Sequence, residues 1–248
     1  MNFLAIALAF VSFVPAQHKQ LIVVTTKNWD AVQGVAQRFD WHDGRYIKVG
    51  PSFPVVVGKT GLAWGLGLVP VHPAPGDPIK REGDGKSPAG LFALPYAFGF
   101  SKTTTRLPFR VLTPAVVCPD DLHSTHYNTL VDSLEVAKDW HSAEQMRSIS
   151  GYRFGVFVAN NSGPVKPGAG SCVFLHIWRD QSRGSVGTVG CTAMTESNIR
   201  LLLRWLDPQG HPVLVQMPAR EYLRYRKSLG LPQLEPVAQR AVIVVPKL

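Results

Sequence analysis

The sequence predicts a mostly β fold, a barrel or sandwich with a few peripheral helices. The 22 glycines and 20 prolines among 248 residues favour turns over long helices. Short apolar runs recur between these turns, as expected for strands. A hydrophobic content of 45% is ordinary for a globular protein. With 248 residues and this content of apolar side chains, the chain can form one large or two small domains with a sizeable core.

Strands are predicted where short apolar runs are bounded by glycine, proline or polar turn residues. In chain order they cover residues 21–25, 46–49, 53–57, 91–94, 110–117, 154–160, 173–178 and 213–217. A turn is expected at 44–45, and the Pro-rich stretch 70–82 is expected to be loop.

Four segments have features of helices. Apolar residues at helical spacing predict a short amphipathic helix within 28–39. Ser142 is expected to cap a helix running through Ile149, and 219–229 is a basic helix candidate. Thr195 is expected to cap another helix. The apolar stripe of that helix consists of Ile199, Leu202, Leu203 and Leu206.

The segment 1–16 is almost entirely apolar, carries no charged side chain and ends in Val14, Pro15 and Ala16. This pattern predicts a secretory signal peptide cleaved after Ala16. An uncleaved anchor and a buried first strand are the alternatives. The segment is short for a membrane span, and nothing later is long and apolar enough, so no span is expected after cleavage.

The formal net charge is +9, which is compatible with nucleic acid or anionic envelope polymers as partners. The basic residues are scattered, however, and no known nucleic-acid-binding motif accompanies them. We therefore expect a solvated basic surface and no nucleic-acid partner.

Residues 171–194 carry the strongest chemical signal. An apolar run ends at His176, a polar Gly-rich loop follows, and Cys191 lies between small residues. A thiol acts as a nucleophile when it is ionised, and a nearby imidazole can take its proton. The amides of Gly190 and Cys191 are candidates to face an oxyanion. These residues predict acyl transfer by a Cys–His pair.

The three cysteines add a second prediction. If the protein is exported and Cys191 is the nucleophile, Cys118 and Cys172 remain to form a disulfide. The alternative is that both are buried free thiols that behave as small apolar side chains.

The chain resembles the L,D-transpeptidase catalytic domain, also called the YkuD-like domain, of bacterial cell-wall enzymes. That family has a His, a loop, then Ser or Thr, His, Gly, Cys, any residue and Arg. His176, Thr188, Gly190 and Cys191 match this pattern, and the SPAGLF segment at 87–92 resembles an upstream family element. The resemblance covers about residues 50–218. It implies a catalytic domain at 17–218, followed by a helix and tail at 219–248.

Two positions depart from the family pattern. Val189 replaces the His before the Gly, and Ala193 replaces the Arg after the Cys. Arg179 or Arg183 is the candidate replacement cation for binding substrate, and Trp178 is a further candidate contact. Thr188 is expected to bond His176 or to shape the turn.

The resemblance implies L,D-transpeptidation of peptidoglycan stem peptides through a Cys191 thioester, with His176 as base. Neither a metal nor an organic cofactor is expected, and the location is the periplasm or cell envelope of a bacterium. The alternatives are an L,D-carboxypeptidase or other hydrolase of envelope peptides, and a peptidoglycan-binding module with weakened chemistry. The oligomeric state is not predicted.

Overall fold

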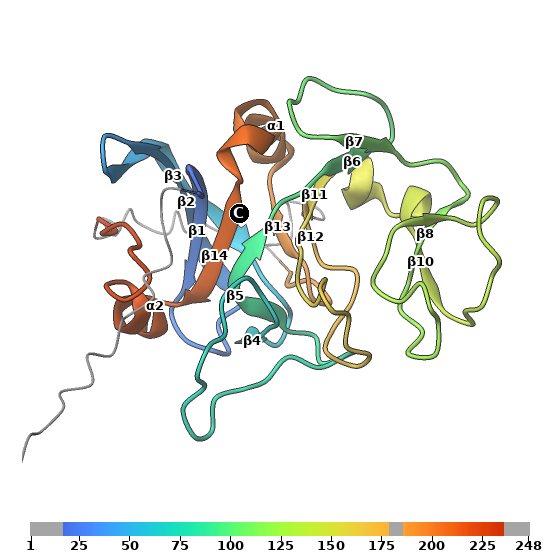
Figure 1. Cartoon of the computed structure of the whole chain (residues 1–248), viewed down its shortest axis with the longest axis horizontal. Coiled ribbons are helices and arrows are strands. Elements are labelled where there is room, and N and C mark those ends of the chain that lie inside the picture. Colours follow the sequence, from blue (N-terminus) through green and yellow to red (C-terminus); the bar gives the residue numbers. More distant parts are fainter. Residues whose placement is uncertain (1–16, 179–185, 236–248) are drawn as a thin grey trace, which may run out of the picture.

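The computed structural model describes residues 17–178 and 186–235 and confirms a mostly β architecture (Figure 1). The strands are β1 (Gln20–Thr26), β2 (Gln33–His42), β3 (Arg45–Val56), β4 (Leu62–Trp64), β5 (Ser87–Ala93), β6 (Ala97–Gly99), β7 (Phe109–Val111), β8 (Val116–Pro119), β9 (Val131–Asp132), β10 (Ala143–Gln145), β11 (Phe154–Phe157), β12 (Phe174–Ile177), β13 (Thr192–Met194) and β14 (Val213–Pro218). The α-helices in the described part are α1 (Glu196–Trp205) and α2 (Ala219–Tyr225).

The strands form one large mixed sheet and one small sheet. The large sheet has the order β4-β5-β14-β1-β2-β3-β13-β12-β11-β6-β7, and the small one the order β10-β8-β9. The small sheet lies to one side of the molecule, on the right in Figure 1. Short 3₁₀ turns at Met146–Ser148 and Ser150–Arg153 lead from β10 back to β11 in the large sheet.

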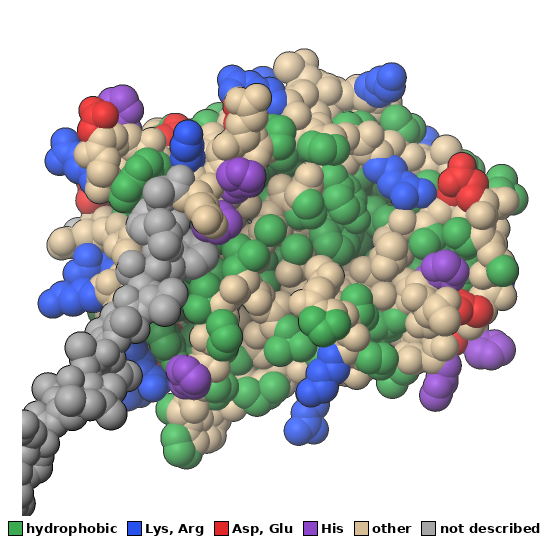
Figure 2. Space-filling model, viewed as in Figure 1, with side chains coloured by type: hydrophobic (Ala, Val, Ile, Leu, Met, Phe, Trp, Pro, Cys, Tyr) green, Lys and Arg blue, Asp and Glu red, His purple; other side chains and the backbone are tan. Residues whose placement is uncertain are grey.

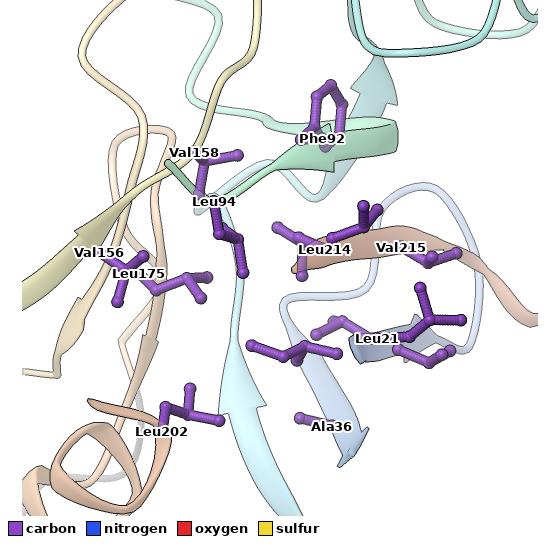
Figure 3. Packing of buried hydrophobic residues seen from close by; sticks show 14 of the residues in the cluster. Leu21, Ala36, Phe92, Leu94, Val156, Val158, Leu175, Leu202, Leu214 and Val215 are labelled. Atoms are coloured by element: carbon purple, nitrogen blue, oxygen red, sulfur yellow. The ribbon is translucent and has the colours of Figure 1, made fainter. Parts of the chain in front are cut away.

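In the large sheet, β1 and β14 are neighbours and run parallel. Both are nearly continuous apolar runs, as expected for strands covered on both faces, and every residue of β14 is buried. Figure 3 shows Leu21 of β1 and Leu214 and Val215 of β14 packing in one cluster with Leu202 of α1. The strands predicted at 21–25 and 213–217 are confirmed.

Helix α1 also follows the prediction. The Thr195 hydroxyl accepts a hydrogen bond from the Asn198 amide at 3.2 Å, which caps the helix. The predicted apolar stripe is buried against the sheet. Its members are Ile199, Leu202, Leu203 and Leu206.

The helix predicted within 28–39 is wrong, because β2 occupies most of that segment. β2 pairs with β1 on one edge and with β3 on the other, and this pairing prevails over helical spacing. Because the polar residues Gln37 and Arg38 are buried, the sequence of β2 lacks the regular alternation of apolar and polar residues that predicts a strand. Arg38 is accommodated with its guanidinium over the Trp205 ring, 5.3 Å from the centroid.

The two strands predicted at 46–49 and 53–57 are one strand, β3. The register with β2 shifts between Ala36 and Arg38, so the extra residues around Pro51 bulge out of the ladder. At the other end of the hairpin, Asp43 and Gly44 both have positive φ, 45° and 81°. This is the conformation of a two-residue type I′ turn, for which Asp-Gly is a favoured sequence.

Two further predictions were wrong beyond this hairpin. The strand predicted at 110–117 is divided between β7 of the large sheet and β8 of the small one. The helix predicted from Ser142 is the strand β10 followed by a 3₁₀ turn, because 143–145 pair with β8. The consequence is that Glu144 lies opposite Cys118.

The surface and the end of the described chain complete the fold. On the face shown in Figure 2, Lys and Arg side chains lie apart rather than in one basic patch. α2 follows β14 directly, and its Tyr222 is buried with its hydroxyl donating to the Pro232 carbonyl at 2.6 Å. No helix of the described residues has the length and apolar character needed to cross a membrane. The predicted signal peptide and tail end lie outside the described residues.

Candidate active site

Cys191 lies just before β13, in a second apolar cluster between the large sheet and the small one. Its sulfur accepts a hydrogen bond from the Phe174 amide at 3.3 Å, and its thiol donates to the Cys172 carbonyl at 3.5 Å. The Tyr152 hydroxyl lies 4.0 Å from the sulfur. Burial raises the pKa of the Cys191 thiol to about 12, and the nearby Glu144 carboxyl acts in the same direction. The resting group is therefore a thiol that needs a base.

The backbone of Cys191 is held by two hydroxyl groups. The hydroxyls of Ser87 and Thr188 both donate to the Cys191 carbonyl, at 2.6 and 2.5 Å. Ser87 also accepts from the Gly58 amide at 2.8 Å, which ties this carbonyl to the end of β3. The SPAGLF segment noted in the sequence thus contacts the candidate nucleophile through its first residue.

Thr188 shapes the turn before Cys191. Besides donating to the Cys191 carbonyl, its hydroxyl accepts from the Gly190 amide at 3.1 Å. The Gly190 amide is engaged by this internal hydrogen bond, and its oxyanion contact stays a prediction. Val189, where the family has His, is 66% exposed at this turn.

His176 lies in β12 and is half-buried. Its Nδ1 lies 2.8 Å from the Ile177 carbonyl, which can only accept, so Nδ1 carries a proton. In the neutral ring, Nε2 is then the basic nitrogen. The ring also contacts the Tyr152 ring edge-to-face, with centroids 5.1 Å apart. Tyr152 is thus a common neighbour of His176 and Cys191.

Cys118 and Cys172 form a disulfide that links β8 to the segment before β12. Cys172 has a positive φ of 53°, and its amide donates to the Asn128 side chain at 2.9 Å. The same residue presents its carbonyl to the Cys191 thiol. The disulfide therefore anchors one of the groups that surround the sulfur.

Of the predicted substrate contacts, Trp178 is the one that lies within the described residues. Trp178 lines an open groove of about 540 Å³ together with Gly34 and Val55, and neither Cys191 nor His176 is among the described residues lining it. Arg179 and Arg183 lie outside the described residues. Ala193 is fully buried in β13, between Val56 and His176. The assignment of the substrate contacts stays a prediction.

Sequence reasoning gave no role to several groups around the sulfur. These are Ser87, Glu144, Tyr152 and the backbone of Cys172 and Phe174. Ser87 was part of a recognised segment. Glu144 was assigned to a helix, and nothing in the spacing of Tyr152 marked it.

Removing the Ser87 hydroxyl should destabilise the protein. Ser87→Ala leaves the Gly58 amide without its acceptor and the Cys191 carbonyl with one donor fewer. Because these groups are buried, the free energy of unfolding should fall by about 1–3 kcal/mol in a urea titration. The control is Ser101→Ala at an exposed site, expected to change it by less than about 0.5 kcal/mol. Equal effects of the two variants would contradict the assigned role.

Comparison with known proteins identifies a family for this chain. The model of the L,D-transpeptidase catalytic domain matches residues 32–215. Bd1075 of Bdellovibrio bacteriovorus is 14% identical, with a TM-score of 0.42, and the match covers 88% of this chain and 57% of that one. Pgp2 of Campylobacter jejuni, titled a helical cell shape determining protein, is 16% identical, with a TM-score of 0.38 and coverages of 80% and 47%.

The chain therefore spans about half the length of these two solved structures. A search of curated proteins gave no significant match. The family match begins at residue 32 rather than near 50, so it includes β2 and the whole β2–β3 hairpin. Since it extends over well more than half of the sequence and contains both His176 and Cys191, the chain belongs to the family of L,D-transpeptidase catalytic domains.

Proposed function

We propose that the protein is an exported cysteine acyltransferase that performs L,D-transpeptidation on peptidoglycan stem peptides. The observation that carries the proposal is the setting of Cys191. It is the one free cysteine, it occupies the family's nucleophile position, and Tyr152 contacts both its sulfur and the His176 ring. Membership of the family supports the choice of substrate class.

In the proposed first half-reaction, Nε2 of His176 takes the proton of the Cys191 thiol. The thiolate attacks the carbonyl that joins an L-centre of the donor stem to its terminal D-residue. The C–N bond breaks, the D-amino acid leaves with the proton returned by His176, and a thioester with Cys191 remains. The Ile177 carbonyl supports this role because it holds the proton of His176 on Nδ1.

In the second half-reaction, an amine of an acceptor stem attacks the thioester. His176 accepts a proton from the amine, and Cys191 leaves as thiol. The Cys191 amide is our candidate for stabilising the oxyanion in both steps, because the Gly190 amide is engaged by Thr188. The chemistry requires no added metal or cofactor.

Water in place of the amine would make the enzyme an L,D-carboxypeptidase. A binding module with weakened chemistry is the other alternative, and the exposed Val189 and buried Ala193 favour it because they replace the family's polar residues. Thr188, Gly190 and the 179–185 segment belong to the proposed site in either case. Export by the segment 1–16 to the periplasm or envelope is part of the proposal.

The test is to incubate the mature protein with purified disaccharide-tetrapeptides and identify the products by mass spectrometry. Cross-linked dimers together with free D-amino acid are the expected result. Free D-amino acid without dimers would replace transpeptidation by hydrolysis. No turnover at all, with a titratable thiol, would overturn the proposal and favour the binding module.

A further inference from the structure

A chain of polar groups, half-buried at Glu144 and buried at Tyr152 and Cys191, leads from the small sheet to the candidate nucleophile. The Tyr152 hydroxyl donates to a Glu144 carboxyl oxygen at 2.7 Å and lies 4.0 Å from the Cys191 sulfur. Glu144 comes from β10, Tyr152 from the 3₁₀ turn before β11, and Cys191 from the residue just before β13. Three separate elements therefore contribute to one line of contacts.

Tyr152 has little freedom to leave this position. It is 3% exposed. Its ring packs edge-to-face against three aromatic neighbours, with centroids 5.1 to 5.9 Å apart. These neighbours are Phe98, Phe174 and His176. Because the ring is fixed, the remaining freedom is the rotation of the hydroxyl hydrogen, which can point to either Glu144 or Cys191.

The Glu144 carboxyl has little to stabilise its negative charge. No ion pair involving it is formed by the residues that the structure describes. Burial raises the pKa of Glu144 to about 7, against the effect of the Tyr152 hydrogen bond. The neighbouring carboxyls of Asp120 and Glu82 raise it further. The carboxyl therefore changes charge close to neutral pH.

Two other charged groups, Lys80 near the sulfur and Glu82 near Glu144, are already engaged. Lys80, which favours the Cys191 thiolate, is buried and bonds Asp84 at 2.6 Å. Glu82 accepts from Ser171 at 2.8 Å and from the Tyr127 hydroxyl. Glu144 thus differs from Glu82 in being linked to Tyr152, and through it to the sulfur.

We propose that Tyr152 and Glu144 form a hydrogen-bond relay that controls the ionisation of Cys191. When Glu144 is ionised, the Tyr152 hydroxyl donates to it, and only its lone pairs face the thiol. When Glu144 is neutral, its own O–H donates to the phenol oxygen, and the Tyr152 hydrogen turns to the sulfur and stabilises the thiolate. Tyr152 contacts the reacting atom, whereas Glu144 is a positioning residue that acts through Tyr152.

The relay changes no covalent bond of the reaction. The thiol proton still goes to the base, and the relay protons move only between donor and acceptor positions. The proposal rests on Cys191 being the nucleophile of the proposed function. It makes a separate statement about the thiol alone, so it is testable without any peptidoglycan substrate.

The test measures the rate at which iodoacetamide alkylates Cys191 in the folded, disulfide-bonded protein as a function of pH. The pH at which the rate rises reports thiol ionisation, whereas changed access would alter only the plateau. The variant Glu144→Gln carries an amide N–H that donates to the phenol oxygen, as the neutral carboxyl does, and it can never become negatively charged. The rise should shift down by about one pH unit, so above the Glu144 pKa of about 7 the variant should be alkylated about tenfold faster at a given pH. Below that pH the two proteins should react at similar rates, because Glu144 is neutral in the wild type as well.

Two controls separate the relay from simple charge removal. In the Tyr152→Phe background, Glu144→Gln should shift the profile clearly less than it does with Tyr152 present, because only the direct charge effect of the carboxylate on the thiol remains. Glu82→Gln removes a nearby carboxyl that does not contact Tyr152, and it should change the rate by less than about threefold. Circular dichroism verifies the fold of each variant. If Tyr152→Phe does not fold, the comparison of Glu144→Gln with Glu82→Gln decides alone.

The relay is overturned if Glu144→Gln leaves the pH profile unchanged. It is also overturned if the full shift persists with Phe at 152, or if Glu82→Gln shifts the profile equally. Failure of the proposed function looks different, because muropeptides would then not be turned over while the thiol profile still responded to Glu144. A relay that fails in an active enzyme would leave the acyltransferase proposal intact.

Discussion

Cys191→Ala is expected to abolish turnover of disaccharide-tetrapeptides, lowering the rate by more than about 10³-fold. The physical reason is that the proposed reaction passes through a thioester that alanine cannot form. The fold should survive, because Ser87 and Thr188 hold the carbonyl of residue 191 and not its side chain. The measurement is the amount of dimer and free D-amino acid formed, quantified by mass spectrometry.

The matched control removes the other two sulfurs. A Cys118→Ser, Cys172→Ser double variant retains Cys191 and should keep measurable turnover at temperatures where it stays folded. Alkylation of the native protein should label Cys191, since the other two cysteines are joined in the disulfide. Wild-type turnover by Cys191→Ala would remove Cys191 from the mechanism and require another nucleophile.

The same double variant should lower the free energy of unfolding by about 4 kcal/mol. The disulfide closes a loop with a sequence separation of 54, and a cross-link of this length restricts the unfolded chain by about that amount. Urea titration of the oxidised wild type and the double variant measures the difference. Reduced wild-type protein should have the same midpoint as the variant.

The contacts of Cys118 and Cys172 also predict which strands of the double variant should lose local stability first. Cys172 carries the carbonyl that accepts from the Cys191 thiol, and Cys118 pairs with Glu144 in the small sheet. Amide hydrogen exchange should therefore quicken in β8 and β10 before it does so in β1 and β14. A loss of stability below about 1 kcal/mol would show that packing, not the cross-link, holds the small sheet in place.

The parts of the fold that could be predicted are those whose sequence pattern and tertiary environment agree. β1 and β14 are nearly continuous apolar runs because both faces are covered, and α1 has a capping threonine and a stripe of buried Ile and Leu side chains. β2 could not be predicted from its pattern. Its two neighbours satisfy its backbone, and Gln37 and Arg38 are buried among them.

For the candidate site, the motif identified His176 and Cys191, because a nucleophile and its base lie on one short segment. The residues that surround them come from distant positions. Ser87 lies 104 residues before Cys191 in the chain, and Tyr152 lies 39 before it. Glu144 is placed by the pairing of β10 with β8, the strand that carries Cys118, and local propensity does not report such a pairing. Contacts of this kind depend on tertiary structure rather than on local periodicity.

The pairing of β1 with β14 has a consequence for how the protein reaches its native state. Leu21 lies opposite Val213, so this parallel pair joins segments almost 200 residues apart. Contacts of such high sequence separation form slowly, because the chain must lose the entropy of a very long loop before they are gained. During synthesis, β1 cannot complete its pairing with β14 until residue 218 has been made. The chain is therefore expected to stay incompletely folded while it is being synthesised and to form the β1–β14 pair late.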